Sequence, residues 1–436
     1  MKQLPPSAAR LSLRLLSCVT LICFCASALA NGQLNRYEVD KLSKHLANRT
    51  EDAAAYATRA GYWAAAGFYD LSLKDYSLAV YYDPDSADYL VSRAIVHFTL
   101  KDYAKADKDC RNAIELDGAN LGAYRTRSHI LLHLGRYKEA IAIASIGLAI
   151  GPSDPKLWRI RGHAYGEIDQ TVKAANDLRL VVEIEPKNAE AWSDLGHFLQ
   201  KNNDLDGALS ALSKSYFLNN TLLAANLHLG QVHLAQGHVD LAEKAFDRVV
   251  TVSPSWQSRL NMSYAKIDAS RGVYEVGQKN WLAAIQHFNK SLARHRDASV
   301  RLNLMDAYKA QLRHLLMHDG NATGAESLFK EATQNFPHDR PALNRYFSSI
   351  WTDWGLAEKG NLETARLRFN RAWKLSQTTE TKKTLIEATV KLMEYYGHKS
   401  GGTTAARDAY NEALKLAIGN DTLTLMIQKK ASAMNL

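Results

Sequence analysis

Small and large residues recur along the chain with a period of 34 residues. The eighth and twentieth places of each period hold only Ala, Ser or Gly, and the fourth, eleventh and twenty-fourth places mostly hold larger residues. Rows of small residues let two antiparallel helices approach closely, and the larger residues fill the space between them. The pattern therefore predicts one helical hairpin per period. Six such segments align without a gap, starting at Ala53, Ala87, Leu121, Pro155, Ala189 and Leu223.

Beyond Pro254 a triplet typical of the second helix continues at a longer interval. It consists of a small residue, an aromatic residue four places later and another small residue three places after that. Successive triplets are 42, 41, 40 and 41 residues apart instead of 34. Because seven extra residues make about two helical turns, we expect four longer, degenerate hairpins over 257–418. The segment 419–436 then predicts a capping helix, which a repeat array needs at its end.

The six regular segments resemble the tetratricopeptide repeat (TPR) family. Their small eighth and twentieth places and the Pro or Gly that ends most second helices carry this resemblance. It implies an all-α fold, a right-handed solenoid of about ten antiparallel helical hairpins. The regular units would occupy 53–256, after an N-terminal lead-in over 31–52. The resemblance also implies that the fifth, ninth and thirteenth places of each first helix line a concave groove.

The first 30 residues have the pattern of a signal peptide. Three basic residues precede an apolar run, and Ala28 and Ala30 are placed for cleavage. The run is shorter than the roughly 20 residues of a membrane-spanning helix, which favours cleavage over an uncleaved anchor. We therefore expect an exported chain that starts at Asn31 and has no stable membrane span. The periplasm is the expected location, with secretion or the lumen of a secretory pathway as alternatives.

Loss of these residues would lower the formal net charge from +9 to +6 and leave Cys110 as the single cysteine. A single cysteine cannot form an internal disulfide, so packing must stabilise the exported chain. Cys110 falls on a core position, which predicts an inert thiol. The small positive charge is too weak to indicate a nucleic acid and favours an acidic protein or peptide. The sequence leaves the oligomeric state open.

Arginine at the seventh place and aspartate at the twenty-third place recur in the same repeats. A pair of this kind, with one partner from each helix, would be partly buried and structural. Arg127 also stands at the seventh place, but Ile143 replaces its aspartate. The expected pairs are Arg59 with Asp75, Arg93 with Asp109, and Arg161 with Asp177.

Basic residues gather on the stripe of the first helices that the resemblance assigns to the groove. The ninth place holds histidine in three consecutive repeats, so these side chains predict a ladder along the groove floor. The basic ligand-binding candidates are Arg125, His129, His133, Lys156, Arg159, His163, His197 and Lys201. Acidic residues are expected at the edges of this groove, at Asp88, Glu167, Glu190 and Asp194.

Three interpretations of the ladder compete. Duplication alone could have copied the histidines, which would then bind nothing in particular. Alternatively, arginine and protonated histidine could bind the carboxylates of an acidic peptide, most strongly at low pH. A metal ion is the third possibility, because His129 with His133 and His314 with His318 are spaced i, i+4. No further ligand group is evident, so we expect no metal and no cofactor. The carboxylate-clamp subset of the family fits poorly, since Ile160 stands where that clamp has asparagine.

The sequence contains no glycine-rich nucleotide loop and no nucleophile elbow. It therefore favours a non-enzymatic, exported binding scaffold that recognises an acidic or extended peptide, or a helix, in its concave groove. Assembly or transport of envelope components is the expected role. One alternative is oligomerisation or partner docking through the C-terminal hairpins, where Trp351, Trp354 and Trp373 cluster in sequence. An enzyme with an unrecognised site is the third class.

Overall fold

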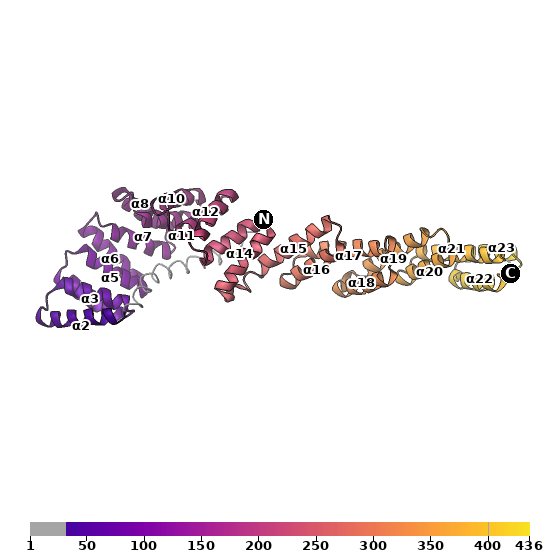
Figure 1. The fold of residues 1–436 in the computed structure, drawn as a ribbon, viewed down its shortest axis with the longest axis horizontal. Helices are drawn as coiled ribbons and strands as arrows, with labels where there is room; N and C mark the ends of the chain where they lie inside the picture. The colour runs from indigo at the N-terminus through magenta and orange to yellow at the C-terminus, as the bar shows by residue number, and fades with distance from the viewer. Residues whose placement is uncertain (1–31, 400) are drawn as a thin grey trace. The chain divides into compact units, whose positions relative to one another are not determined.

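The computed structural model describes residues 32–399 and 401–436, and the expected signal peptide lies outside them. The described chain consists of α-helices, turns and two short 3₁₀ helices, so the fold is all-α, as the sequence predicts. It divides into two units, the first ending at Gln257 and the second beginning at Ser258. Figure 1 shows the order of the helices in each unit.

The first unit begins with helix α2 (Gly32–Asn48), which packs on the first of six helical hairpins. In every hairpin the first helix has 13 residues and the second has 14. The hairpins are α3 (Ala53–Ala65) with α4 (Tyr69–Tyr82), α5 (Ala87–Thr99) with α6 (Tyr103–Leu116), α7 (Leu121–His133) with α8 (Tyr137–Ile150), α9 (Pro155–Glu167) with α10 (Thr171–Ile184), α11 (Ala189–Lys201) with α12 (Leu205–Leu218), and α13 (Leu223–Ala235) with α14 (Val239–Val252). The 3₁₀ helix η1 (Pro254–Trp256) follows them.

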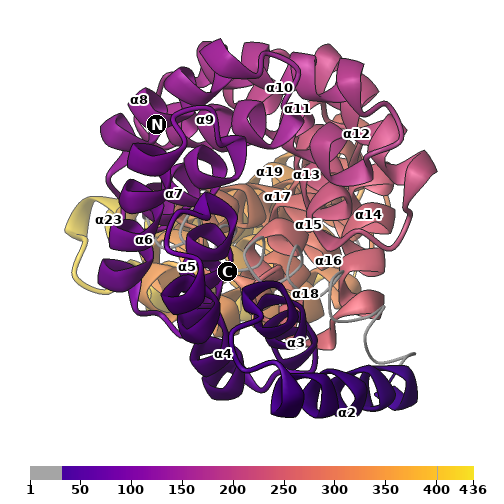
Figure 2. The same cartoon turned by 90° about the vertical axis from the view of Figure 1, so that its left-hand side faces the viewer.

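These hairpins follow a curved path. Figure 2 shows the first helices α5, α7, α9, α11 and α13 on the inner side and their second helices on the outer side. Several neighbouring first helices contact each other: α5 with α7, α7 with α9, and α11 with α13. We call the surface formed by the first helices of this unit the inner face. It is the part of the fold that positions the candidate site.

The sequence explains the boundaries of these hairpins. Asp or Asn precedes several first helices and caps them, as Asp154 does by accepting from the backbone N–H groups of Lys156 and Leu157 (3.0 and 3.1 Å). The turn inside each hairpin needs a left-handed residue at the fifteenth place. Glycine supplies it in three repeats, whereas three others use a residue with a side chain. The glycines are Gly67, Gly135 and Gly237, and the others are Lys101, Asp169 and Asn203.

The second unit contains four hairpins and a final helix, α23 (Asp421–Ser432), which packs against α21 and α22. A short 3₁₀ helix, η2 (Pro337–Asp339), precedes the third hairpin. The hairpins are α15 (Asn261–Gly277) with α16 (Trp281–Arg294), α17 (Ala298–Met317) with α18 (Ala322–Asn335), α19 (Arg340–Leu356) with α20 (Leu362–Leu375), and α21 (Thr379–Gly397) with α22 (Thr403–Ala417).

The longer interval of the second unit lengthens mainly one helix of each hairpin. Its first helices have 17, 20, 17 and 19 residues, whereas its second helices keep 14, 14, 14 and 15. The added length of these hairpins therefore lies mainly in the first helix. The conserved triplet spacing is the reason, because it fixes the packed length of the second helix and leaves only the first helix and the turns free to extend.

Candidate functional site

Three arginine–aspartate pairs join the two helices of their own hairpins. Arg59 Nε donates to Asp75 Oδ2 (2.7 Å) and its Nη2 donates to Oδ1 (2.8 Å). The aspartates are buried, so these pairs hold the hairpins together and are not open to a ligand. The same two-bond geometry, at 2.8 to 3.0 Å, joins Arg93 with Asp109 and Arg161 with Asp177.

Arg127 lacks an aspartate in its own repeat and pairs with an aspartate of the preceding repeat. Its Nε donates to Asp107 Oδ1 across the boundary between two hairpins (3.0 Å). Arg111 approaches the same carboxylate at 3.4 Å. Sequence reasoning missed this partner because it looked for the acid only at the twenty-third place of the same repeat.

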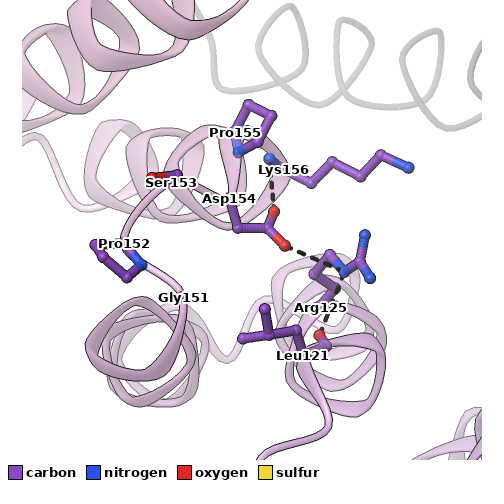
Figure 3. Close-up of a pocket in the computed structure, with 8 residues that line it drawn as sticks. All are labelled: Leu121, Arg125, Gly151, Pro152, Ser153, Asp154, Pro155 and Lys156. Carbon is purple, nitrogen blue, oxygen red and sulfur yellow. Dashed lines mark hydrogen bonds and ion pairs between the residues drawn. The ribbon is translucent and has the colours of Figure 1, made fainter.

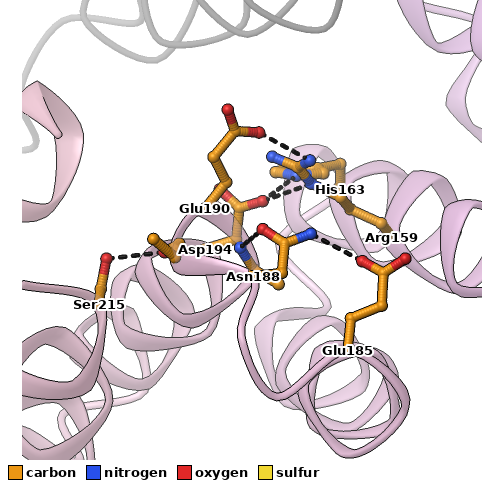
Figure 4. Close-up of polar contacts among 9 residues, drawn as sticks. Arg159, His163, Glu185, Asn188, Glu190, Asp194 and Ser215 are labelled. Atoms are coloured by element: carbon orange, nitrogen blue, oxygen red, sulfur yellow. Dashed lines mark hydrogen bonds and ion pairs between the residues drawn. The ribbon is translucent and has the colours of Figure 1, made fainter. Parts of the chain in front are cut away.

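Arg159 lies on the inner face and pairs with acidic residues of the next repeat through two of its three nitrogens, while its Nη2 is buried without a hydrogen-bond partner. Its Nε donates to Asp194 Oδ2 (2.7 Å) and its Nη1 donates to Glu190 Oε2 (3.0 Å). His163 Nε2 donates to the same Asp194 oxygen (3.0 Å), as Figure 4 shows. The expectation that Glu190 and Asp194 lie at the edges of a basic groove was wrong. They neutralise its centre, because the stacking of α9 on α11 brings these places together.

The carboxylate of Asp194 accepts hydrogen bonds from both basic side chains of this group. Burial alone would raise the pKa of Asp194, but Arg159 and His163 outweigh burial and hold that pKa well below its usual range. The same carboxylate and Glu190 raise the pKa of Arg159 against the effect of burial. Both groups therefore stay ionised, and they form a buried ion pair that links two repeats.

The histidine ladder continues onto α13 through a residue that sequence reasoning missed. The rings of His197 and His228 lie 4.3 Å apart, and His228 Nδ1 donates to Gln231 Oε1 (3.2 Å). Burial lowers the pKa of both imidazoles, that of His197 well below its ordinary value. These rings are therefore neutral at pH 7. The available signal was the sixth place, which lies on the same stripe and holds His228.

His129 and His133 are held by aromatic side chains. The ring of Phe98 contacts both imidazoles, with centroids 5.1 Å from His129 and 5.5 Å from His133. Tyr103 Oη and His133 Nε2 lie 2.8 Å apart. Burial lowers the pKa of His129 to about 4, aided by the neighbouring His133, His163 and Arg159. The expected strengthening of anion binding by protonated histidine therefore finds no support at His129 or His197 in mild acid.

The remaining basic candidates are more open. Arg125 is 36% exposed and its Nε contacts Asp154 Oδ2 at 3.4 Å. It lines an open pocket of about 510 Å³ between α7 and the start of α9, together with the exposed Lys156. Figure 3 shows the ends of Arg125 and Lys156 pointing to the same side of this pocket. Lys201 is also exposed, with its Nζ 5.6 Å from the centre of the Phe198 ring.

The tryptophans of the second unit do not form one exposed cluster. Trp351 is 7% exposed and packs against Trp354, over which the Arg368 guanidinium lies at 3.7 Å. Trp373 packs against a different set of core residues around Phe369. Trp351 and Trp354 therefore pack together, and Trp373 lies apart from them in another core cluster.

Other chemistry is limited in the part of the chain that the structure describes. It contains no group of three or more His, Cys, Asp or Glu side chains placed to hold a metal ion. Cys110 is buried, and burial raises the pKa of its thiol to about 12. Among residues 32–399 and 401–436, no helix is both long and apolar enough to cross a membrane.

Two stretches of the chain match family models described as "Tetratricopeptide repeat", over residues 87–120 and 194–258. The first coincides with the second hairpin and the turn after it, and the second extends from α11 to just beyond η1.

Curated relatives match parts of the chain, and their names include a TPR repeat-containing protein. TPR repeat-containing protein MJ1428 of Methanocaldococcus jannaschii is 24% identical over 52% of this chain and 42% of its own length. The mitochondrial import receptor subunit TOM70 of Homo sapiens is 24% identical over 48% of this chain and 36% of its own length. The match thus spans less than half of either relative.

Among solved structures, the C-terminal part of a TPR repeat-containing protein from Cytophaga hutchinsonii superimposes with a TM-score of 0.45 at 14% identity, covering 56% of this chain and 98% of that one. The in-register hairpins, their small eighth and twentieth places and the two family matches agree: the chain contains tetratricopeptide repeats.

Proposed function

We propose that this chain is a non-enzymatic scaffold whose inner face binds an extended segment or helix of a partner protein. TPR proteins are generally protein-interaction scaffolds, which supports a protein partner. The observation that carries the proposal is the polar stripe from α7 to α13, which is fixed by ion pairs between repeats. A pre-organised surface of this kind loses little conformational entropy when a partner binds.

We further propose that acidic groups of the partner bind at Arg125 and Lys156. The buried charges of Arg159 and Asp194 neutralise each other, so they offer little attraction to a ligand. The Nε of Arg125 makes the nearest contact to Asp154 and donates to Leu121 O (3.3 Å), and its terminal nitrogens can donate charge-assisted hydrogen bonds to a carboxylate. Lys156 adds a second cation at the same pocket. An acidic residue of the partner would thus lie near two cations, Arg125 and Lys156, and one anion, Asp154.

Selection of peptides from a random 12-residue library tests this function. The wild type should enrich acidic sequences, and Arg125→Glu/Lys156→Glu should bind the selected peptides at least about tenfold more weakly, a change of 1.4 kcal/mol. Lys244→Glu is the matched control, because Lys244 is exposed on the outer helix α14. An unbiased selection, or equal loss in the control, would contradict the inner-face site.

Export and a role in assembly or transport of envelope components belong to the same proposal. The signal pattern over residues 1–30 supports export, with the periplasm as the location. N-terminal sequencing of the chain produced in a bacterium should give Asn31 as the first residue, in a periplasmic fraction. An intact N-terminus in the cytoplasm would contradict export and leave the inner-face proposal unaffected.

A further inference from the structure

The C-terminal end of helix α17 carries two histidines on one side. His314 stands in the last turn and His318 directly follows the helix, four residues later. Both are exposed, their ring centroids are 5.1 Å apart, and their planes differ by 28°. We propose that His314 and His318 bind one divalent first-row transition-metal ion, with water completing its coordination. This site is independent of the inner-face function, and it departs from the sequence-based expectation of no metal.

The separation of the rings suits a shared ion, and their stacked planes must turn before one nitrogen of each points to it. Imidazole nitrogen binds Zn²⁺ at about 2.0–2.1 Å, so two imidazoles on one ion in tetrahedral geometry have ring centres about 5 Å apart. The observed separation is 5.1 Å. Rotation of the two exposed side chains is therefore enough to direct one nitrogen from each ring to a shared ion. Imidazole ligands favour Zn²⁺, Cu²⁺ and Ni²⁺ over Mg²⁺ or Ca²⁺.

A carboxylate orients the first ligand. His314 Nδ1 donates to Asp319 Oδ2 (3.2 Å), which leaves Nε2 as the nitrogen available to a metal. Histidines that bind metals usually donate their second ring nitrogen in this way. The turn after α17 holds Asp319 in place, since Gly320 adopts φ +63° and Asn321 N donates to Leu315 O (2.8 Å).

The position in the helix also favours a cation. α17 is the longest helix of the described residues, and the carbonyl groups at its C-terminus attract positive charge. The adjacent Arg313 does not cancel this effect, because its guanidinium is paired with Asp353 (3.1 Å). The negative end of the helix dipole and the nearby Asp319 carboxylate therefore both attract a divalent ion to this end of α17.

The other histidine pair with the same spacing lacks these properties. His129 and His133 both contact Phe98, and His133 Nε2 lies 2.8 Å from Tyr103 Oη. Arg159 and His163 add positive charge near His129. The structure therefore separates two pairs that are alike in sequence: one is packed into the inner face, and the other is free to chelate.

Titration of the full chain, without a polyhistidine tag, tests the site. Isothermal titration with Zn²⁺ at pH 7.5 should give one site, and Cu²⁺ should give an electron paramagnetic resonance spectrum with two nitrogen ligands. The double variant His314→Gln/His318→Gln should lose this binding while its circular dichroism stays unchanged. Asp319→Asn should weaken binding about tenfold, as loss of an orienting partner does at other metal sites.

His338→Gln serves as the matched control, because His338 is another exposed histidine of the second unit. The proposal is overturned if the wild type fails to bind Zn²⁺ or if the double variant binds it with unchanged affinity and stoichiometry. Loss of the site in His129→Gln/His133→Gln instead would overturn it equally.

Discussion

Arg159 of α9 and Asp194 of α11 form a buried ion pair across the boundary of two repeats, with Nε and Oδ2 2.7 Å apart. Asp194→Ala leaves the arginine buried without its main partner, so we expect the free energy of unfolding to fall by about 3–5 kcal/mol. Urea denaturation followed by circular dichroism measures this loss. The double variant Arg159→Leu/Asp194→Leu should recover part of it, because it removes the central pair of charges together and leaves only Glu190 and His163 without these partners. Equal losses in the single and double variants would show that packing, not charge, is responsible.

The first unit should lose stability in mild acid through His129. The folded state lowers the pKa of this imidazole to about 4, whereas an unfolded histidine takes up a proton near pH 6.5. Between these pH values residue 129 is protonated only in the unfolded chain. The free energy of unfolding therefore falls as pH decreases from about 6.5 to 4. The shift corresponds to a loss on the order of 3 kcal/mol.

Unfolding measured at several pH values checks this dependence. His129→Gln should flatten the slope in that window, and His338→Gln should leave it unchanged because that side chain is exposed. A slope that persists in His129→Gln would assign it to other buried histidines such as His197, whose pKa is also lowered.

Glycine at the fifteenth place should stabilise the hairpins that lack it. Lys101 and Asp169 adopt φ values of +64° and +59°, a conformation that costs a residue with a side chain about 1 kcal/mol or more. Lys101→Gly and Asp169→Gly should therefore raise the unfolding free energy by up to about 1 kcal/mol each. Gly67→Ala is the reciprocal test and should lower it, since no atom crowds that position and only its φ of +83° opposes the change. Thermal denaturation distinguishes these directions.

Cys110 should be unreactive until the second hairpin opens. Its thiol is buried and its pKa is raised to about 12, mainly by burial, so almost no thiolate exists at pH 8. An aromatic disulfide reagent such as DTNB should label it only in denaturant, at the same urea concentration at which helicity is lost. Rapid labelling of the native chain would contradict the packed environment.

The sequence predicts well whatever lies inside one repeat. Arg59 and Asp75 occupy fixed places of the same hairpin, so their pairing follows from the 34-residue pattern. Contacts between repeats depend on the offset of one hairpin against the next, which the period does not contain. For this reason the partners of Arg127 and Arg159 were missed or placed at the edges. The ninth place alone does not predict His228, because this histidine stands at the sixth place of its repeat.

This distinction limits how the array could be lengthened. A tandem duplication of the segment 155–188 would carry the Arg161–Asp177 pair intact, because both partners travel together. Arg159 would then face the second and sixth places of a copy of its own repeat, which hold Lys156 and Ile160 in place of Glu190 and Asp194. The inserted module would fold its own hairpin yet bury an arginine beside a lysine. The repeats in this stretch are therefore not interchangeable, because the charged side chains of each first helix match only those of the repeat that follows it.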